Sequence, residues 1–227
     1  MEIKQDEILQ EFSFKVPGIY EIRIIINDKW NTTLSAYVDG SNIEDVLKQI
    51  EAYQVDEDVN FNVYMTVNPC RKYCEAREQY GKLKRSRITT QDDDVEALTW
   101  LPIDIDPPHP AGTSASDEEK KQALVMTEEL VNYMALKGWN VPEIMDSGNG
   151  YHIKYRIYLP NDDNGRELVA NMLENLSEIF PLVDVTTKNP SRILTVPGSL
   201  KMKGRSIEDR PHRWARIMDK PSQTIGD

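Results

Sequence analysis

Apolar positions in the first third of the chain repeat with the spacings of strands and of one amphipathic helix. The most apolar stretch, IYEIRIIIN at residues 19–27, is rich in β-branched side chains, which favour strands. Residues 61–67 (FNVYMTV) alternate in the manner of a half-buried strand. The pattern predicts strands over 19–27, 33–38 and 61–67, and a helix over 43–53 that begins after Ser41-Asn42.

The rest of the chain alternates between helical and strand-like segments. Residues 70–98 are polar and charged, and we expect a helix followed by a loop there. Ser116 and Glu119 have the spacing of a capping box, and Gly138 suits the end of the helix they would open. The pattern predicts helices over 117–137 and 165–180, and strands near 99–105, 142–146, 151–159, 182–186, 192–196 and 212–218. This order favours α/β or α+β layers.

The chain has 227 residues, enough for one large domain or for two small lobes that share a core. No apolar run reaches the ~18 residues that a membrane span needs, and the N-terminus lacks the apolar region of a secretory signal. We therefore expect a cytoplasmic protein without a membrane partner, whose Cys70 and Cys74 are free thiols. Residues 219–227 look like a linker, and the chain is expected to be part of something longer.

The formal net charge is −11, which argues against a protein that coats nucleic acid without specificity. The charge is unevenly spread, because residues 71–87 carry +5 and residues 188–220 carry +6. Each run alone is most simply a solvated surface, whereas two in one domain could form a focused positive groove. Both interpretations stay open at this point.

Asp104 and Asp106 lie near the end of a predicted strand and form the first candidate site. Side chains two residues apart on a strand point to the same face, so the two carboxylates should converge. Adjacent carboxylates repel each other unless a cation lies between them, and Mg²⁺ or Mn²⁺ prefers oxygen ligands. The alternative is an acidic strand end that is only solvated.

The segment Ser147-Gly148-Asn149-Gly150-Tyr151-His152 forms the second candidate site. Its two glycines allow a close approach of the backbone to a ligand and could leave N–H groups free for an anion. A hydroxyl and an imidazole beside such a turn suit a phosphate group. The alternative is an ordinary hairpin with His152 packed in the sheet.

A third candidate site combines Asp184 with the cations that follow it, Arg192 and Lys201. Asp184 ends a short apolar segment, and a following strand and turn could bring both cations back beside it. Three acids with two cations suit a metal-bound polyphosphate, in which acids hold the metal and cations hold phosphate oxygens. The alternative for each cation is an exposed surface charge.

The order of these motifs resembles the archaeo-eukaryotic primase (AEP) superfamily, most closely the primase-polymerases of phages, plasmids and CRISPR-associated cassettes. The resemblance rests on DxD, then SGxGxH, then an Asp followed by NPSR and a PG turn with lysines. It extends over most of the chain through TVNP at 66–69 and RPHRW at 210–214.

The resemblance implies an α+β core over about residues 1–218. A modified RNA-recognition-motif-like lobe (about 99–218) would pack on a smaller αβ module (about 1–98), with the active-site cleft between them. By motif position, the metal-binding acids would be Asp104, Asp106 and Asp184. The nucleotide contacts would be Ser147, Gly148, Gly150, His152, Arg192 and Lys201.

The activity implied is two-metal nucleotidyl transfer with Mg²⁺ or Mn²⁺, using a single-stranded DNA template, a primer strand and NTPs or dNTPs. A helicase domain or other replication or CRISPR proteins outside this chain are possible partners. Weaker candidates for DNA contacts are Arg85, Arg87, Lys203 and Arg210. We expect no zinc, because structural zinc takes four Cys or His ligands and this chain has two Cys and three His.

Two other classes of protein compete with this interpretation. A metal-dependent nuclease would use the same acids, but it does not explain the paired phosphate contacts Arg192 and Lys201. A non-catalytic nucleic-acid-binding module would retain the fold alone, and such a degenerate copy should have lost at least one of the acids or the histidine.

Overall fold

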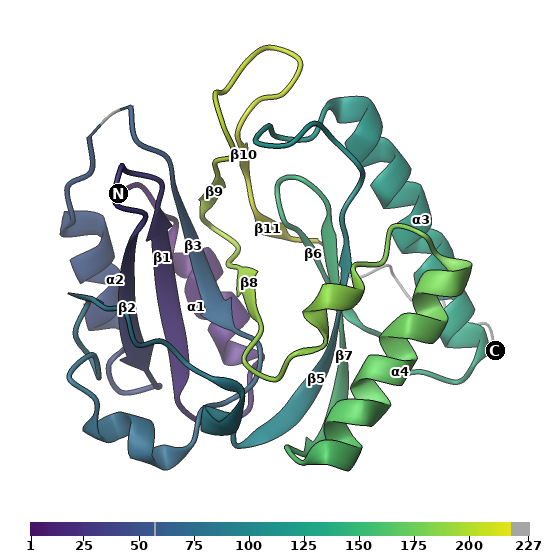
Figure 1. The fold of residues 1–227 in the computed structure, drawn as a ribbon, viewed down its shortest axis with the longest axis horizontal. Coiled ribbons are helices and arrows are strands. Elements are labelled where there is room, and N and C mark those ends of the chain that lie inside the picture. The colour runs from purple at the N-terminus through teal and green to yellow at the C-terminus, as the bar shows by residue number, and fades with distance from the viewer. Residues whose placement is uncertain (57, 219–227) are drawn as a thin grey trace.

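The computed structural model describes residues 1–56 and 58–218, so the linker prediction for residues 219–227 lies outside the described residues. The chain forms two antiparallel sheets, each with its own helices, side by side (Figure 1). No helix in the described ranges combines the length and the apolar character required to cross a membrane. Each sheet has a separate hydrophobic core, which makes the molecule two-lobed.

The N-terminal sheet has the strand order β4-β2-β1-β3-β8. Ile22, Ile24 and Ile26 alternate along its central strand β1 and pack in one core with helix residues such as Ile8 and Val46. The elements of this lobe are α1 (Gln5–Ser13), β1 (Tyr20–Ile26), β2 (Thr32–Val38), α2 (Ile43–Ala52), β3 (Phe61–Thr66), β4 (Lys84–Arg85) and β8 (Ile193–Thr195). Because β8 pairs with β3, the chain returns to the N-terminal sheet near its end.

The second sheet has the order β11-β6-β7-β5, and α3 and α4 cover one of its faces (Figure 1). Its elements are β5 (Ala97–Ile105), α3 (Asp117–Leu136), β6 (Glu143–Asp146), β7 (Tyr151–Pro160), α4 (Asp163–Ile179) and β11 (Arg216–Ile217). Ile103 and Ile105 of β5 and Ile153 of β7 face the helices. The alternating residues of both strands, including Asp104 and His152, therefore lie on the opposite face, toward the N-terminal lobe.

Most of the predicted elements are present within one or two residues of their expected ends. Ser116 and Glu119 form the reciprocal capping box at the start of α3, and Gly138, with φ +84°, follows its C-terminus. Asn42 lies at the N-cap of α2, but its side chain accepts a hydrogen bond from the Asp39 backbone instead of capping the helix.

Two segments differ from the prediction. Residues 70–98 contain only the short 3-10 turns η1 (Lys72–Ala76) and η2 (Asp92–Asp94) and strand β4 before β5 begins. Tertiary contacts hold this segment in place, among them an ion pair of 2.7 Å between Arg77 and Asp94. The predicted strand at 182–186 is instead the turn η3 (Val185–Lys188), because the Asp184 carboxylate accepts a hydrogen bond from the Thr186 N–H and caps that turn.

A two-stranded ribbon lies between the lobes and was expected only in part. It pairs β9 (Leu200–Lys201) with β10 (Arg213–Trp214), so the strand predicted at 212–218 is divided into β10 and β11. The loop between β9 and β10 forms the arch at the top of Figure 1. The ribbon carries Lys201 into the space between the two sheets.

The two basic segments do not form one groove. Strand β4, from residues 71–87, is at one edge of the N-terminal sheet, and β8, from residues 188–220, is at the other. Four strand spacings separate them, which is about 19 Å. Several cations of the first segment are also paired with acids, such as Arg77 with Asp94 and Lys84 with Glu78.

Candidate active site

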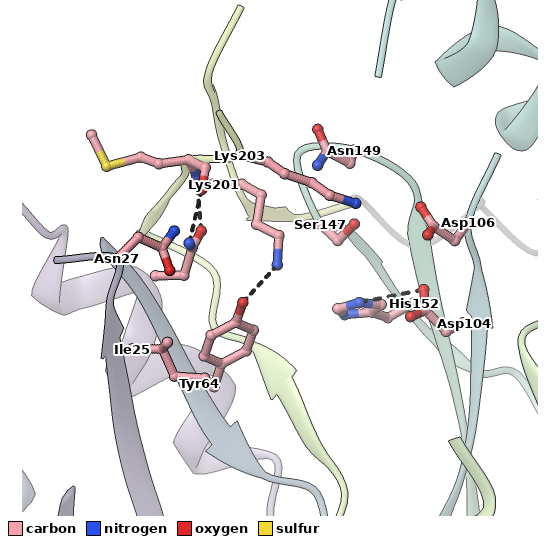
Figure 2. Close-up of a pocket in the computed structure, with 12 residues that line it drawn as sticks. Ile25, Asn27, Tyr64, Asp104, Asp106, Ser147, Asn149, His152, Lys201 and Lys203 are labelled. Carbon is pink, nitrogen blue, oxygen red and sulfur yellow. Dashed lines mark hydrogen bonds and ion pairs between the residues drawn. The ribbon is translucent and has the colours of Figure 1, made fainter. Parts of the chain in front are cut away.

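A pocket of about 290 Å³ lies between the two sheets, and both lobes contribute to its walls (Figure 2). One wall carries acids and an imidazole from the ends of β5 and β7, and the other carries side chains from the end of β1 and from β3, with one lysine of β9 and one just after it. The lining residues are Ile25, Asn27, Asn62, Tyr64, Asp104, Asp106, Ser147, Asn149, His152, Lys201, Met202 and Lys203. Opposite charges therefore face each other across one cavity.

Asp104 and Asp106 converge on this pocket, as their spacing predicts. Asp104 is directly opposite His152 in the β5–β7 register, next to the end of the pairing. Burial, followed by the nearby Asp106 carboxylate, raises the pKa of Asp104 to about 7. Two carboxylates that are held together where ionisation is unfavourable form an arrangement that a cation would stabilise.

His152 is buried on the same wall. Burial, together with the positive charge of Lys201, lowers the pKa of His152 to about 3, so its imidazole is neutral at pH 7. Its Nε2 atom is 3.6 Å from Asp104 Oδ1, which is beyond hydrogen-bond distance, and its buried Nδ1 atom has no partner among the described residues. The ring is thus held by packing and keeps hydrogen-bonding capacity for a ligand.

Asp184 lies beside this pair but does not line the pocket. Its backbone N–H donates to the Asp104 carbonyl at 2.9 Å, which places the two residues next to each other. Its carboxylate accepts from both the N–H and the hydroxyl of Thr186, at 2.8 Å each. The third predicted acid is therefore adjacent to the first two, and its oxygens are engaged with its own turn.

Lys201 is held at the centre of the pocket by the N-terminal lobe. Its ammonium donates to the Tyr64 hydroxyl at 3.1 Å and to the Thr195 hydroxyl at 2.9 Å, and it lies 4.6 Å from the Tyr64 ring centroid. Both hydrogen-bond partners are neutral hydroxyl groups, so the charge of the ammonium is available to an anionic ligand. The lysine predicted as a phosphate contact thus faces the acids across the pocket.

The neighbouring backbone is fixed to β3. The Asn62 side chain accepts from the Met202 N–H at 2.8 Å and donates to the Met202 carbonyl at 2.8 Å. Beyond it, Lys203 also lines the pocket, with its ammonium 3.3 Å from His109 Nε2. Lys203 was expected to be a weak DNA contact, and the structure places it in the same pocket as Asp106.

In the loop between β6 and β7, the backbone amides of the two glycines are hydrogen-bonded within the loop and to the last residue of β6, whereas the sequence suggested that they could be free for an anion. The Gly148 N–H donates to Asp146, and the Gly150 N–H donates to the Ser147 hydroxyl at 3.1 Å, so these two amides are not free for an anion. Gly148, at φ +93°, instead packs on Lys201, because an added Cβ would be 2.6 Å from the lysine Cβ. The glycines thus allow close packing, and Ser147 and Asn149 reach the pocket.

Four other predicted cations do not line this pocket. The Arg192 guanidinium donates to the carbonyl of Thr186, and Arg210 forms two hydrogen bonds, of 2.7 and 2.8 Å, to Glu119. Arg85 contacts Asp28 and Thr32 at the far edge of the sheet, and Arg87 follows it, exposed. Arg192 still lowers the pKa of Asp104 through its charge, after the larger effects of burial and nearby acids.

Several pocket residues were missed from the sequence, notably Asn62 and Tyr64. The strand FNVYMTV contained a signal for them, because period-two alternation puts both on the face opposite Phe61, Val63 and Met65. The sequence could not indicate that this polar face of β3 lies opposite the acids of the other lobe. The residues missed are Ile25, Asn27, Asn62, Tyr64 and Met202, whereas Asn149 belongs to the second candidate segment but was given no role of its own.

The side chains of this wall suit a divalent cation. Asp104 and Asp106 supply the oxygen donors that Mg²⁺ and Mn²⁺ prefer, and burial followed by the charge of Asp106 raises the pKa of Asp104 despite the nearby Lys201 and Arg192. Within the described ranges, no three His, Cys, Asp or Glu side chains gather as a ready-made metal cluster. Asp184 could join the other two only by rotating away from Thr186.

Comparison with known proteins adds one similarity. No protein-family model matches the chain, and no curated protein matches it. Among solved structures, it resembles the AEP domain of the primase-polymerase of cyanophage S-2L, with a TM-score of 0.53 and 14% sequence identity. The match covers 97% of this chain and 92% of that one.

The comparison therefore shows the fold. The chain folds as an α+β, AEP-like domain over nearly its whole length, as the resemblance in its motifs implied. The shared fold does not by itself assign a reaction, which has to be argued from the pocket.

Proposed function

We propose that this chain is a nucleotidyltransferase, a primase-polymerase that synthesises or extends primers on a single-stranded DNA template. The observation that carries the proposal is the pocket itself, in which Asp104 and Asp106 face Lys201 and Lys203 across one cavity. A nucleoside triphosphate carries both of the features that these walls complement, a polyphosphate for the lysines and metal-bound oxygens for the acids.

In the proposed reaction a primer 3′-hydroxyl attacks the α-phosphate of the incoming nucleotide, and pyrophosphate leaves. Mg²⁺ or Mn²⁺, held by Asp104 and Asp106 with Asp184 as the adjacent third acid, would stabilise the charge on the attacking and leaving oxygens. Lys201 would neutralise the polyphosphate, and its fixed position means that little rearrangement is needed on binding. Positioning and charge neutralisation together supply the catalysis.

His152 would act as a neutral hydrogen-bonding group to the bound nucleotide. Because its pKa is low, the imidazole is neutral at neutral pH. It would therefore orient the nucleotide through a hydrogen bond without adding a positive charge. The Ser147 hydroxyl, which lines the same wall, accepts from Gly150 and can still donate its own hydrogen to a phosphate oxygen. Gly148 and Gly150 would support these contacts through close packing.

A direct test incubates a primed single-stranded DNA template with the protein and Mg²⁺ or Mn²⁺, with and without nucleotides. The proposal expects a longer primer only when nucleotides are present, and no shortening without them. A metal-dependent nuclease would shorten the DNA whether or not nucleotides are added. Omitting the primer and comparing NTPs with dNTPs then tests primer synthesis, which forms part of the same proposal.

The wider setting of this reaction is also a proposal. A primase-polymerase acts on single-stranded DNA, which a helicase exposes, so a helicase domain or other replication or CRISPR-associated proteins outside this chain would be its partners. Such a role would place the protein in the cytoplasm. Copurification of a DNA-unwinding activity with the protein from its native source would support this setting.

A further inference from the structure

A strongly exposed tryptophan lies at the tip of the β1–β2 hairpin, three residues after Asn27, which lines the pocket. The side chain of Trp30 is 70% exposed, and only Tyr158 among the described aromatic residues is more exposed, at 81%. A large aromatic ring in water gains much from a partner that can cover it. Its position in the fold indicates what that partner is.

The hairpin turn holds Trp30 in place. The Asp28 carboxylate accepts from the backbone N–H of Trp30 at 3.0 Å and from the N–H and hydroxyl of Thr32 at 2.9 and 2.7 Å. Asn31 adopts φ +47°, which closes the turn. The ring is thus presented on an ordered turn, which reduces the entropy lost when a ligand stacks on it.

The hairpin separates two hollows. Asn27, at the base of the turn, lines the nucleotide pocket, whereas Asp28 and Thr32 line a second hollow that also contains Asp56. Arg85 also lines the second hollow, but Asp28 and Asp56 together outweigh it, and the resulting net negative charge disfavours a phosphate backbone there. A nucleic-acid strand would therefore pass on the side of the nucleotide pocket, where Lys201 and Lys203 lie.

A cation lies against the ring as well. The Lys29 ammonium is 4.9 Å from the centroid of the Trp30 ring, whereas Arg85 of the neighbouring strand β4 is paired with Asp28 and lines the second hollow. An exposed aromatic ring with adjacent cations is the combination that single-stranded nucleic acids bind, since bases stack on the ring and phosphates pair with the cations.

We propose that Trp30 is a stacking platform for a base of the single-stranded template, with Lys29 as a phosphate contact. The inference rests on the proposed function for its choice of ligand. Three residues separate Asn27 from Trp30, at most about 11 Å of chain. Stacked nucleotides rise about 3.4 Å each, so a base stacked on Trp30 would lie within a few nucleotides of the strand segment that passes the pocket.

The test measures binding of a fluorescein-labelled oligothymidylate by anisotropy, without nucleotides or metal, over a series of salt concentrations. Trp30→Ala is expected to weaken binding about tenfold without changing the salt slope, and Trp30→Phe to retain most of the affinity. Lys29→Ala is expected to reduce the salt slope by about 0.7. Tyr158→Ala is the matched control, because this exposed tyrosine lies seven residues along β7 from Tyr151, about 23 Å away.

Equal affinity of Trp30→Ala and the wild type would overturn the inference, and so would an equal loss in Tyr158→Ala. A surface that binds a protein instead of nucleic acid would give the first of these results. Primer extension separates this inference from the proposed function. If Trp30 supports DNA binding but the wild type never extends a primer, the proposed function is wrong and the stacking role of Trp30 is retained. If the wild type extends primers and Trp30→Ala binds DNA normally, the platform alone fails.

Discussion

At the scale of single residues, the pocket depends on pairs of side chains that come from different strands. Lys201 and Tyr64 are far apart in sequence, and their contact between the ribbon and β3 fixes the position of the lysine ammonium in the pocket. Asp104 and His152 are brought together by strand register alone. The acids could be recognised from their spacing. The alternation of β3 indicates the face on which Tyr64 lies, but not that its hydroxyl contacts Lys201.

Tyr64→Phe removes the hydroxyl that accepts from Lys201 and keeps the ring beneath the ammonium. The lost hydrogen bond to a charged group is expected to raise the KM for the nucleotide about tenfold, with a smaller effect on kcat. Steady-state primer extension over a range of nucleotide concentrations measures both constants. Tyr158→Phe, at an exposed position, is the matched control, and an unchanged KM in Tyr64→Phe would reject the positioning role.

At the scale of elements, the sequence predicted those that carry their own signals. The β5 strand is a largely apolar run that ends before a proline-rich turn, and α3 has both its capping box and its final glycine, so both were located well. The segment 70–98 has no such periodicity and takes its shape from distant contacts, such as that of Arg77 with Asp94. Helix α1 was missed because only Ile8 and a few neighbours of this short segment mark an apolar face.

Gly148→Ala tests the loop that packs against the ribbon. An added Cβ meets Lys201 at 2.6 Å and faces a positive φ, so the ribbon must shift or the loop must strain. The expected result is a KM for the nucleotide that rises several-fold, together with a Tm lower by about 2–4 °C. Gly40→Ala is the control, because its added Cβ has no neighbour within 4 Å and its φ is ordinary. Equal kinetics for the two variants would contradict this role of Gly148.

Glu119→Gln tests the junction of α3 with the loop that carries Arg210. The hydrogen bonds from Arg210, with further ones from Ser116, lower the pKa of Glu119 to about 2 from an ordinary value of 4.5. A lowered pKa means that ionised Glu119 stabilises the fold above about pH 4.5 and that this contribution disappears as the pH falls toward about 2.

The Tm difference between the wild type and Glu119→Gln is therefore expected to be largest near neutral pH and to shrink between about pH 4.5 and 2. Since the pair is partly exposed, the difference at pH 7 should be only a few degrees. Thermal unfolding followed by circular dichroism measures it. A difference that stays constant down to pH 2 would show that the charge of Glu119 has no part in this junction.

At the scale of the whole molecule, buried charges join the lobes beneath the active site. Lys154 of β7 forms ion pairs with Glu11 of α1 and with Glu143 of β6, and all three side chains are buried. Burial works to raise the pKa of Glu11, but the charges of Lys154 and Lys15 outweigh it and lower that pKa. Lys154 is two residues from His152 on the same strand face, so this cluster anchors α1 below the pocket.

Lys154→Met is expected to reduce the free energy of unfolding by about 3–5 kcal/mol, because two buried carboxylates lose their shared cation. Urea denaturation at neutral pH measures the change. Lys48→Met removes a lysine from an exposed pair with Asp45 and should leave the stability nearly unchanged. If the two variants were equally stable, the ion cluster would not be what joins the lobes.

The central claim is that Asp104 and Asp106 hold the cation for nucleotidyl transfer opposite Lys201. Its most direct test is primer extension by the Asp104→Asn, Asp106→Asn double variant, with circular dichroism to verify the fold. The account predicts a folded protein whose rate of extension with Mg²⁺ or Mn²⁺ falls at least about 100-fold. A folded double variant that extends primers at the wild-type rate would contradict it.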